Sequence, residues 1–221
     1  MQKIVIFGAG GGASTALRYF EKDIEFEVVG FTVDRHHMKV DRYLDRPVVP
    51  FDVVEKEFSV EDHQLFMLLG FDNLNELRRQ KFLEGKEKGY SFASYISQRC
   101  DFDKSVSIGE NCFILDGQTI NFDVTIEDNV VMWSGNHIGD RTTIRSHNWI
   151  TSHVAIGGDC EVGASSFLGM NCTIAHNVAI AQSNIIGAGT VITQSSKDNE
   201  VFVIPGTKAS NFDSLQFARL M

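Results

Sequence analysis

The chain has 221 residues, of which 43% are hydrophobic and 22% charged, as is typical of a globular protein with one large domain or two small ones. Its formal net charge of −9, with no basic run, argues against non-specific nucleic-acid binding. The N-terminus lacks the pattern of a signal peptide, and no segment has the roughly 18 consecutive apolar residues of a membrane span. We therefore expect a cytoplasmic protein without a membrane span.

Strands and helices alternate through residues 1–90. Short aliphatic runs at residues 3–7, 26–33 and 64–69 predict buried strands, and residues 14–20 and 74–85 predict helices. Val48 and Val49 lie between two prolines and predict at most a brief strand or a loop. The alternation predicts a parallel α/β sheet of Rossmann-like type that is too short for a complete dinucleotide fold.

A glycine-rich segment joins the first predicted strand to the first predicted helix. It matches G-x-G-x-x-[GA] and contains Gly8, Gly10, Gly11, Gly12 and Ala13. Glycines let a backbone approach a pyrophosphate, and the N-terminus of the following helix favours negative charge. Asp34, at the end of the second strand, can accept hydrogen bonds from a ribose or a base. The segment predicts a nucleotide-sugar site rather than an NAD site; the alternative is that its glycines only form a tight turn.

From Ile108 to Ile192, every sixth residue is a bulky aliphatic, without an exception. A period of six matches neither a helix nor a simple strand. It predicts a parallel β-helix over residues 105–209, in which the chain turns a corner every six residues and each coil has three edges. Residues 91–104 are predicted as a linker and residues 210–221 as a C-terminal tail.

Two further sets of residues follow this repeat. Cys112, Cys160 and Cys172 occupy a slot of mostly small residues that should point into the coil, and the cysteines show no zinc-ligand spacing, so we predict buried thiols and no metal site. An outward column of apolar residues, spaced 18 apart, needs a cover and contains Phe113, Val131, Trp149, Phe167 and Ile185. We expect this stripe to be a subunit interface; the alternative is that the first domain or the tail packs on it.

Four histidines occupy outward slots of the predicted coil: His137, His147, His153 and His176. A histidine is a natural general base for deprotonating an attacking amine or hydroxyl group near neutral pH. A solvated surface role is the alternative for each of them. His137 and His153 are 16 residues apart, so they should be diagonal neighbours on adjacent coils.

The segments FGAGGGA, SGNHIG, SHVAIGGDCEVG, FLGMNCTI, IIGAGTVI and VIPGTKA together make the chain similar to sugar acyltransferases of the NeuD/PglD type. These belong to the left-handed β-helix (hexapeptide-repeat) acyltransferases, and the resemblance covers nearly the whole chain. It implies an N-terminal domain that holds a nucleotide-linked sugar, a left-handed C-terminal coil and a homotrimer. Acetyl-CoA, the co-substrate, would lie in the groove between two adjacent β-helices.

The resemblance also implies site residues, with one departure. The position at which many relatives have a catalytic histidine is Asp140 here, and a second histidine position, near the acetyl group, aligns with Trp149. His137 is our candidate base, His147 and His153 are also near, and His153 is expected beside the substrate. Otherwise Asp140 assists, or the substrate amine enters already unprotonated. Residues expected to contact CoA, in addition to Trp149, are Gly169, Gly187, Ala188 and Lys208.

These residues lead to one expected activity. The chain is expected to be an acetyl-CoA-dependent N-acetyltransferase acting on a UDP- or dTDP-linked amino-deoxysugar in bacterial surface glycan synthesis. An O-acetyltransferase of a sialic-acid-like sugar is an alternative within the same class. A non-catalytic sugar-binding scaffold is the alternative outside it, because Asp140 replaces the usual histidine.

Overall fold

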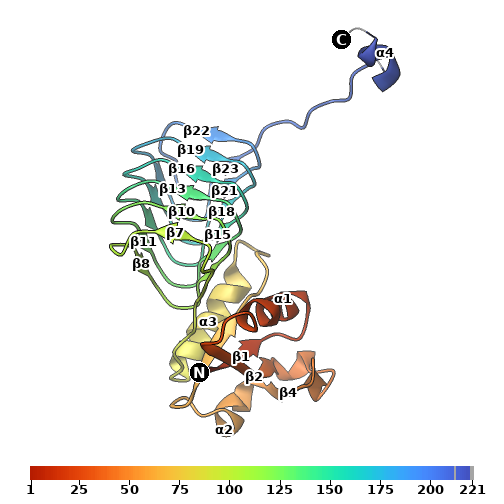
Figure 1. The fold of residues 1–221 in the computed structure, drawn as a ribbon, viewed down its shortest axis with the longest axis vertical. Coiled ribbons are helices and arrows are strands. Elements are labelled where there is room, and N and C mark those ends of the chain that lie inside the picture. The colour runs from red at the N-terminus through yellow and green to blue at the C-terminus, as the bar shows by residue number, and fades with distance from the viewer. Residues whose placement is uncertain (212, 220–221) are drawn as a thin grey trace.

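The computed structural model describes residues 1–211 and 213–219. Figure 1 shows an α/β domain at one end, a three-sided coil stacked on it, and an extended C-terminal segment that leaves the far end of the coil. Among the residues described, none of the helices combines the length and apolar character needed to cross a bilayer. The two unlike halves predicted from the sequence are therefore present and lie directly against each other.

The N-terminal domain is built on a five-stranded sheet of order β3-β4-β2-β1-β5. Its strands are β1 (Gln2–Phe7), β2 (Phe26–Val33), β3 (Arg42–Tyr43), β4 (Arg46–Pro50) and β5 (His63–Met67). The pairs β1–β2, β1–β5 and β2–β4 are parallel, and β3 pairs antiparallel with β4. The parallel sheet is confirmed, and the region of Val48 and Val49 forms a full strand with a short hairpin at the sheet edge.

Helices pack on this sheet through apolar positions. Helix α1 (Gly11–Phe20) buries Ala13, Ala16, Leu17 and Phe20, which share one face at helical spacing. Helix α3 (Glu76–Glu87) connects the domain to the coil. Shorter elements are η1 (Arg35–His37), η2 (Phe51–Val53) and α2 (Val54–Glu57). Helix α1 begins three residues before the predicted start, because Gly11, Gly12 and Ala13 form its first turn.

The coil has three parallel sheets, and each strand of two residues pairs with strands one coil away. The domain-facing sheet contains β6 (Tyr95–Ile96), β9 (Phe113–Ile114), β12 (Val131–Met132), β15 (Trp149–Ile150), β18 (Phe167–Leu168), β21 (Ile185–Ile186) and β23 (Val201–Phe202). The histidine sheet contains β7 (Asp101–Phe102), β10 (Thr119–Ile120), β13 (His137–Ile138), β16 (Ala155–Ile156), β19 (Thr173–Ile174) and β22 (Val191–Ile192). The third sheet contains β8 (Ser107–Ile108), β11 (Thr125–Ile126), β14 (Thr143–Ile144), β17 (Glu161–Val162) and β20 (Ala179–Ile180).

The backbone at the corners explains the composition of the repeat. Most corners have a residue with positive φ three positions after the aliphatic residue, for example Asn111, Asp123, Asn129 and Gly135. Glycine, asparagine and aspartate tolerate this left-handed conformation best, and most of these corner residues are of those types. The repeat aliphatics fill the interior together with Cys112, Cys160 and Cys172, which are 0–3% exposed, so the prediction of buried thiols is confirmed.

The predicted linker, residues 91–104, is instead largely part of the coil. Strand β6 pairs with β9, and β7 pairs with β10, in the same register as all later coils. Ile96 and Phe102 continue the six-residue series backward from Ile108. The prediction was wrong because Phe102 is aromatic and was not counted among the repeat aliphatics.

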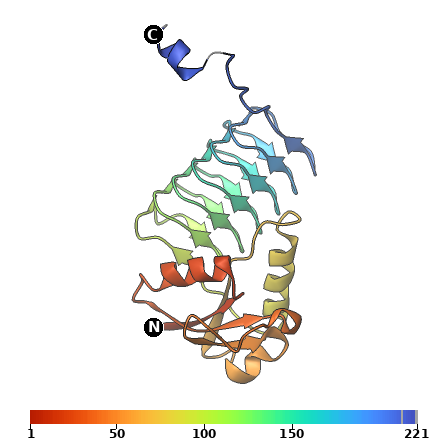
Figure 2. The same cartoon turned by 90° about the vertical axis from the view of Figure 1, so that its right-hand side faces the viewer.

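The apolar stripe is covered by the first domain, so its assignment as a subunit interface is wrong for the first three residues. Phe113, Val131 and Trp149 are 0%, 1% and 7% exposed and belong to one hydrophobic cluster with residues of the N-terminal domain. Figure 2 shows this domain beneath the lower coils. Phe167 and Ile185 stay partly exposed, although the Phe167 ring lies 4.9 Å from that of Phe71 in the first domain.

Candidate functional site

The glycine-rich loop offers an open helix terminus. Gly8 has a φ of +114°, and its N–H donates to the Thr32 oxygen at 2.7 Å, which sets the tight turn after β1. A Cβ on Gly12 would stand 2.2 Å from the Leu68 oxygen, so this glycine permits close packing, whereas Gly10 and Gly11 face open space. Helix α1 has no acidic residue in its first turn and no side-chain cap, so its first N–H groups are available to an anion.

Asp34 lies at the carboxyl end of β2, but its carboxylate already has a partner. Its Oδ1 accepts a hydrogen bond from Lys81 Nζ at 2.7 Å, and the Asp34 side chain is 18% exposed. Partial burial acts against the charged form of Lys81, yet hydrogen bonds to Asp34 and Glu84 raise the pKa of Lys81 overall. Helix α3 thus fixes the Asp34 carboxylate beside the glycine-rich loop and leaves Oδ2 as the oxygen for another partner.

His137 and His153 lie at the same edge of the histidine sheet. His137 is exposed, and its strand neighbours one coil below and above are Thr119 and Ala155, neither of which is bulky. The His137 N–H donates to the Val154 oxygen at 3.0 Å, so His153 stands one coil above the start of β13. The His153 ring lies against Gly135, where a Cβ would be 2.5 Å from Nδ1. The predicted diagonal arrangement of these two histidines is present.

Asp140 lies at the opposite edge, at the corner between the histidine sheet and the third sheet. Its Oδ1 accepts the Phe122 N–H at 3.3 Å. Gly158 lies one coil above Asp140, and His176 lies one coil above Gly158. A Cβ on Gly158 would be 3.4 Å from His176 Nδ1 and 3.2 Å from the backbone oxygen of Asp140. Gly158 therefore lies in close contact with both residues.

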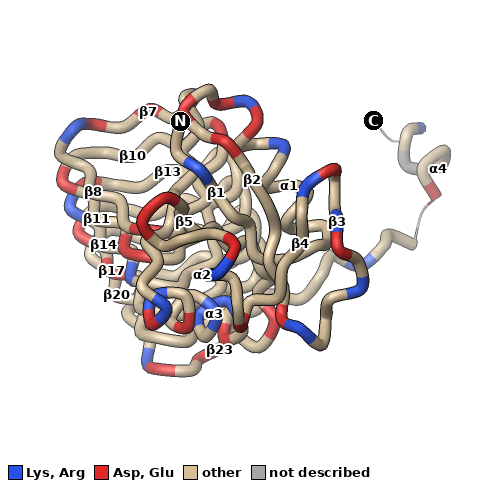
Figure 3. Tube along the Cα trace, turned by 90° about the horizontal axis from the view of Figure 1, so that it is seen from below, with Lys and Arg blue, Asp and Glu red and all other residues tan. Residues whose placement is uncertain are grey.

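An ion-pair cluster lies beside Gly158. Arg141 makes a two-pronged contact with Asp159 at 2.6 and 2.8 Å, and His176 Nε2 lies 3.5 Å from the same carboxylate. The Arg141 hydrogen bonds lower the pKa of Asp159, which stays ionised as a partner for the imidazole. Neither residue of this pair was predicted as a site residue, although the spacing of 18 residues from Arg141 to Asp159 places them on neighbouring coils. Acidic and basic residues are interspersed along this part of the coil (Figure 3).

The residues predicted to contact CoA do not all come together. Gly169 and Gly187 share a corner column on the edge that carries His153, and a Cβ on Gly169 would be 2.5 Å from the Ala188 nitrogen. Trp149 is instead buried against the first domain, where its ring lies 5.3 Å from that of Phe71, so its predicted contact with CoA is wrong. Lys208 is exposed in the C-terminal segment that leaves the coil (Figure 2).

His147 belongs to the contact between the domains rather than to the exposed face. Its Nδ1 accepts a hydrogen bond from the Asn129 amide at 2.8 Å, and the Phe82 ring is 5.9 Å away. Burial, followed by the nearby Arg78 and Arg79 charges, lowers the pKa of His147 to about 4. The imidazole is neutral at neutral pH and is committed to this contact, so it is a poor candidate for the base.

Arg78 of α3 is the centre of this contact, and no pattern in the sequence predicted its role. Its side chain is 0% exposed and donates to the Asn129 carbonyl and, at 3.0 Å, to Asn129 Oδ1. It also donates to the carbonyls of His147 and Asn148 at 3.1 and 3.2 Å and to Asn75 Oδ1 at 3.0 Å. Desolvation by burial lowers the pKa of Arg78 to about 9.

A large cleft lies elsewhere. It has a volume of about 1090 Å³ and lies between the start of α3 and the third sheet, where Arg145 bridges Glu127 and Glu161. Of the candidate residues predicted from the sequence, His147 lines it. A site formed between two copies of the chain need not be a pocket in one copy, so we give this cleft no role in the chemistry.

Comparison with known proteins identifies the fold. No protein-family profile matches the chain, and no curated protein matches it in sequence. Perosamine N-acetyltransferase of Caulobacter crescentus, solved as a variant with CoA and GDP-perosamine, is 23% identical with a TM-score of 0.79, over 91% of this chain and 93% of that chain. The acetyltransferase domain of PglB from Neisseria gonorrhoeae is 18% identical with a TM-score of 0.78, over 91% and 96%.

A structure of the same PglB domain with acetyl coenzyme A gives a TM-score of 0.75 at 16% identity, over 90% of this chain and 93% of that chain. The match covers both parts of the chain in each comparison. The chain therefore has the two-part fold of these acetyltransferases, in which a Rossmann-like domain precedes a left-handed parallel β-helix of hexapeptide repeats.

Proposed function

We propose that the chain is an acetyl-CoA-dependent N-acetyltransferase of a nucleotide-linked amino sugar. The observation that carries this proposal is the match of both domains, in the same order, to structures solved with CoA and GDP-perosamine or with acetyl coenzyme A. The open N-terminus of α1 beside Gly10 and Gly11 supports a phosphate-bearing ligand in the first domain. Synthesis of a bacterial surface glycan is the expected use of the product.

In the proposed reaction the sugar amine attacks the thioester carbonyl of acetyl-CoA directly. His137 takes the proton from the nitrogen, backbone N–H groups stabilise the oxyanion, and the CoA thiolate leaves. The small neighbours Thr119 and Ala155 support this role, because they leave the His137 imidazole accessible from the face of the sheet. The four cysteines lie in or against the coil interior, which agrees with transfer without a covalent intermediate on the enzyme.

The proposed active form is a homotrimer. Gly169, Gly187 and Ala188 lie on one edge of the histidine sheet and Asp140 on the other, so one chain offers two separate half-sites. A groove between neighbouring coils would bring one edge of each copy together around acetyl-CoA. With the first three stripe residues covered by the N-terminal domain, the interface must use the exposed faces of the coil.

The nucleotide and the acceptor atom are tested together by one assay. The purified chain is mixed with acetyl-CoA and each of a panel of UDP-, dTDP- and GDP-linked sugars, in amino and in hydroxyl forms, and free thiol is measured with time. Thiol release with one amino sugar is the expected result. Release only with hydroxyl sugars indicates O-acetylation. Binding of a nucleotide sugar without release indicates a scaffold, which the aspartate at position 140 keeps as an alternative.

A further inference from the structure

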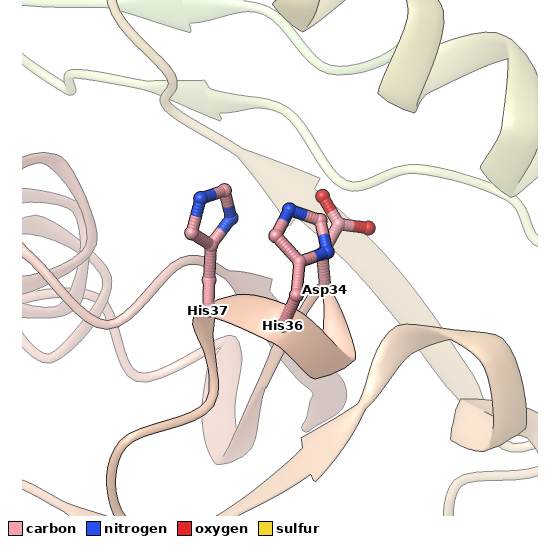
Figure 4. Close-up of side chains that lie close together, drawn as sticks. All are labelled: Asp34, His36 and His37. Atoms are coloured by element: carbon pink, nitrogen blue, oxygen red, sulfur yellow. The ribbon is translucent and has the colours of Figure 1, made fainter.

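Three side chains of types that commonly bind metal ions lie close together just after β2. Asp34 precedes the short turn η1, and His36 and His37 belong to it. One ligand atom from each of the three residues lies within 4.8 Å of the others. The two imidazole rings have centroids 4.0 Å apart. Figure 4 shows the His36 ring beside the Asp34 carboxylate and the His37 ring on the same side of the turn.

The chemistry of this set suits a divalent transition metal. Two imidazoles and one carboxylate are typical ligands of Zn²⁺, Co²⁺, Ni²⁺ and Fe²⁺. Bonds of about 2.0–2.1 Å place tetrahedral ligand atoms roughly 3.3 Å apart, so the set has to contract slightly. His36 and His37 are exposed, so their rings can rotate to do this without disturbing the core. Three protein ligands leave at least one coordination position open.

Lys81 orients the carboxylate but does not occupy it fully. Its ammonium group holds Asp34 Oδ1 at 2.7 Å and Glu84 at 2.8 Å, which leaves Asp34 Oδ2 for a metal ion. Hydrogen bonds from outside to a ligating carboxylate are a common feature of metal sites. The positive charge of Lys81 also repels a cation, so binding is favoured further when an anion completes the coordination.

The three side chains lie close to the loop at which a nucleotide phosphate is proposed to bind. The last residues of β2 lie beside the glycine-rich loop, because the Gly8 N–H donates to the Thr32 oxygen at 2.7 Å, and Tyr43 from the neighbouring hairpin donates to the Gly10 oxygen at 3.3 Å. We propose that Asp34, His36 and His37 form a site for a divalent transition metal ion whose open positions take phosphate oxygens of the nucleotide. The metal site stands on its own residues, whereas the phosphate contact rests on the proposed function.

Calorimetric titration of the untagged, metal-free chain with Zn²⁺, and visible absorption with Co²⁺, test the metal site. We expect one ion per chain, and at least about a tenfold loss of affinity in His36→Gln and in His37→Gln. His176→Gln is the matched control, since this exposed histidine also lies near a carboxylate, and it should bind as the wild type does. Equal affinity in the wild type and the double variant His36→Gln/His37→Gln would overturn the proposal.

A second titration tests the phosphate contact. UDP and GDP affinities are measured with and without saturating Zn²⁺, with the parent nucleosides and the double variant as controls. The diphosphate should bind more tightly with metal only in the wild type, and by linkage the metal should bind more tightly with the diphosphate by the same factor. Metal binding that leaves diphosphate affinity unchanged would refute the phosphate contact. Failure of acetyl transfer alone would refute the proposed function and leave the metal titration intact.

Discussion

Replacing Arg78 by methionine should loosen the attachment of the N-terminal domain to the coil. The guanidinium is fully buried and reaches from α3 to three carbonyl groups of the coil, those of Asn129, His147 and Asn148. Methionine fills a similar volume and donates no hydrogen bond. The substitution therefore removes the polar contacts that Arg78 makes with the coil. It keeps most of the apolar contacts and the hydrogen bonds between Met67 and Asn111.

The size of the effect follows from the acceptors left behind. The Asn148 oxygen keeps a second donor, the Val131 N–H at 3.0 Å, whereas Arg78 is the donor that the described residues show for the Asn129 and His147 oxygens. Two buried carbonyls without a partner cost about 1–3 kcal/mol each. Relief of the desolvation that lowers the Arg78 pKa to about 9 offsets part of this. We expect a net loss of about 3 kcal/mol in the free energy of unfolding.

Urea unfolding followed by tryptophan fluorescence measures this loss, because Trp149 lies at the contact, with the Arg78 guanidinium 5.6 Å from its ring. A lower midpoint, or an early transition of the first domain alone, is expected. Arg79→Met is the matched control. Among the described residues the Arg79 ion pair is with Glu76 of its own helix, and its side chain is 42% exposed, so the change should cost less than about 0.5 kcal/mol. An Arg78→Met midpoint equal to that of the control would refute the reasoning.

Three further changes have expected outcomes. The pKa of His147 is about 4 in the folded chain against a usual 6.5, so the unfolded chain binds more protons between these two pH values. The free energy of unfolding should therefore fall by about 2–3 kcal/mol as the pH drops from 7 to 4. The fall should be smaller in His147→Asn. His137→Asn should lower turnover by about 10²–10⁴-fold with little change in KM, and if Asp140→Asn loses turnover instead, the base is Asp140. Phe71→Ala should remove ring contacts to Trp149 and shift its emission at a cost of about 1–2 kcal/mol; unchanged emission would contradict the assigned packing.

The sequence alone determined the coil. An aliphatic residue at every sixth position, with glycine, asparagine or aspartate at many corners, is a local pattern that repeats, and each repeat contacts only its neighbours. For the same reason the burial of Cys112, Cys160 and Cys172 was predictable, and so was the proximity of His137 and His153. The strand–glycine–helix order of the first domain is equally local, so its parallel sheet and its glycine-rich loop were also predictable from the sequence.

Only the tertiary structure decided how the two domains meet. An exposed apolar column shows that Phe113 and Trp149 need a cover, but two different surfaces can provide it with the same gain from burial. The contact from Arg78 to Asn129 spans 51 residues and joins two unlike folds, so no periodic pattern in the sequence predicts it. Likewise, Asp34 meets Lys81 only because α3 packs beside the end of β2, and that packing brings one oxygen of Asp34 to a lysine and leaves the other to a further ligand.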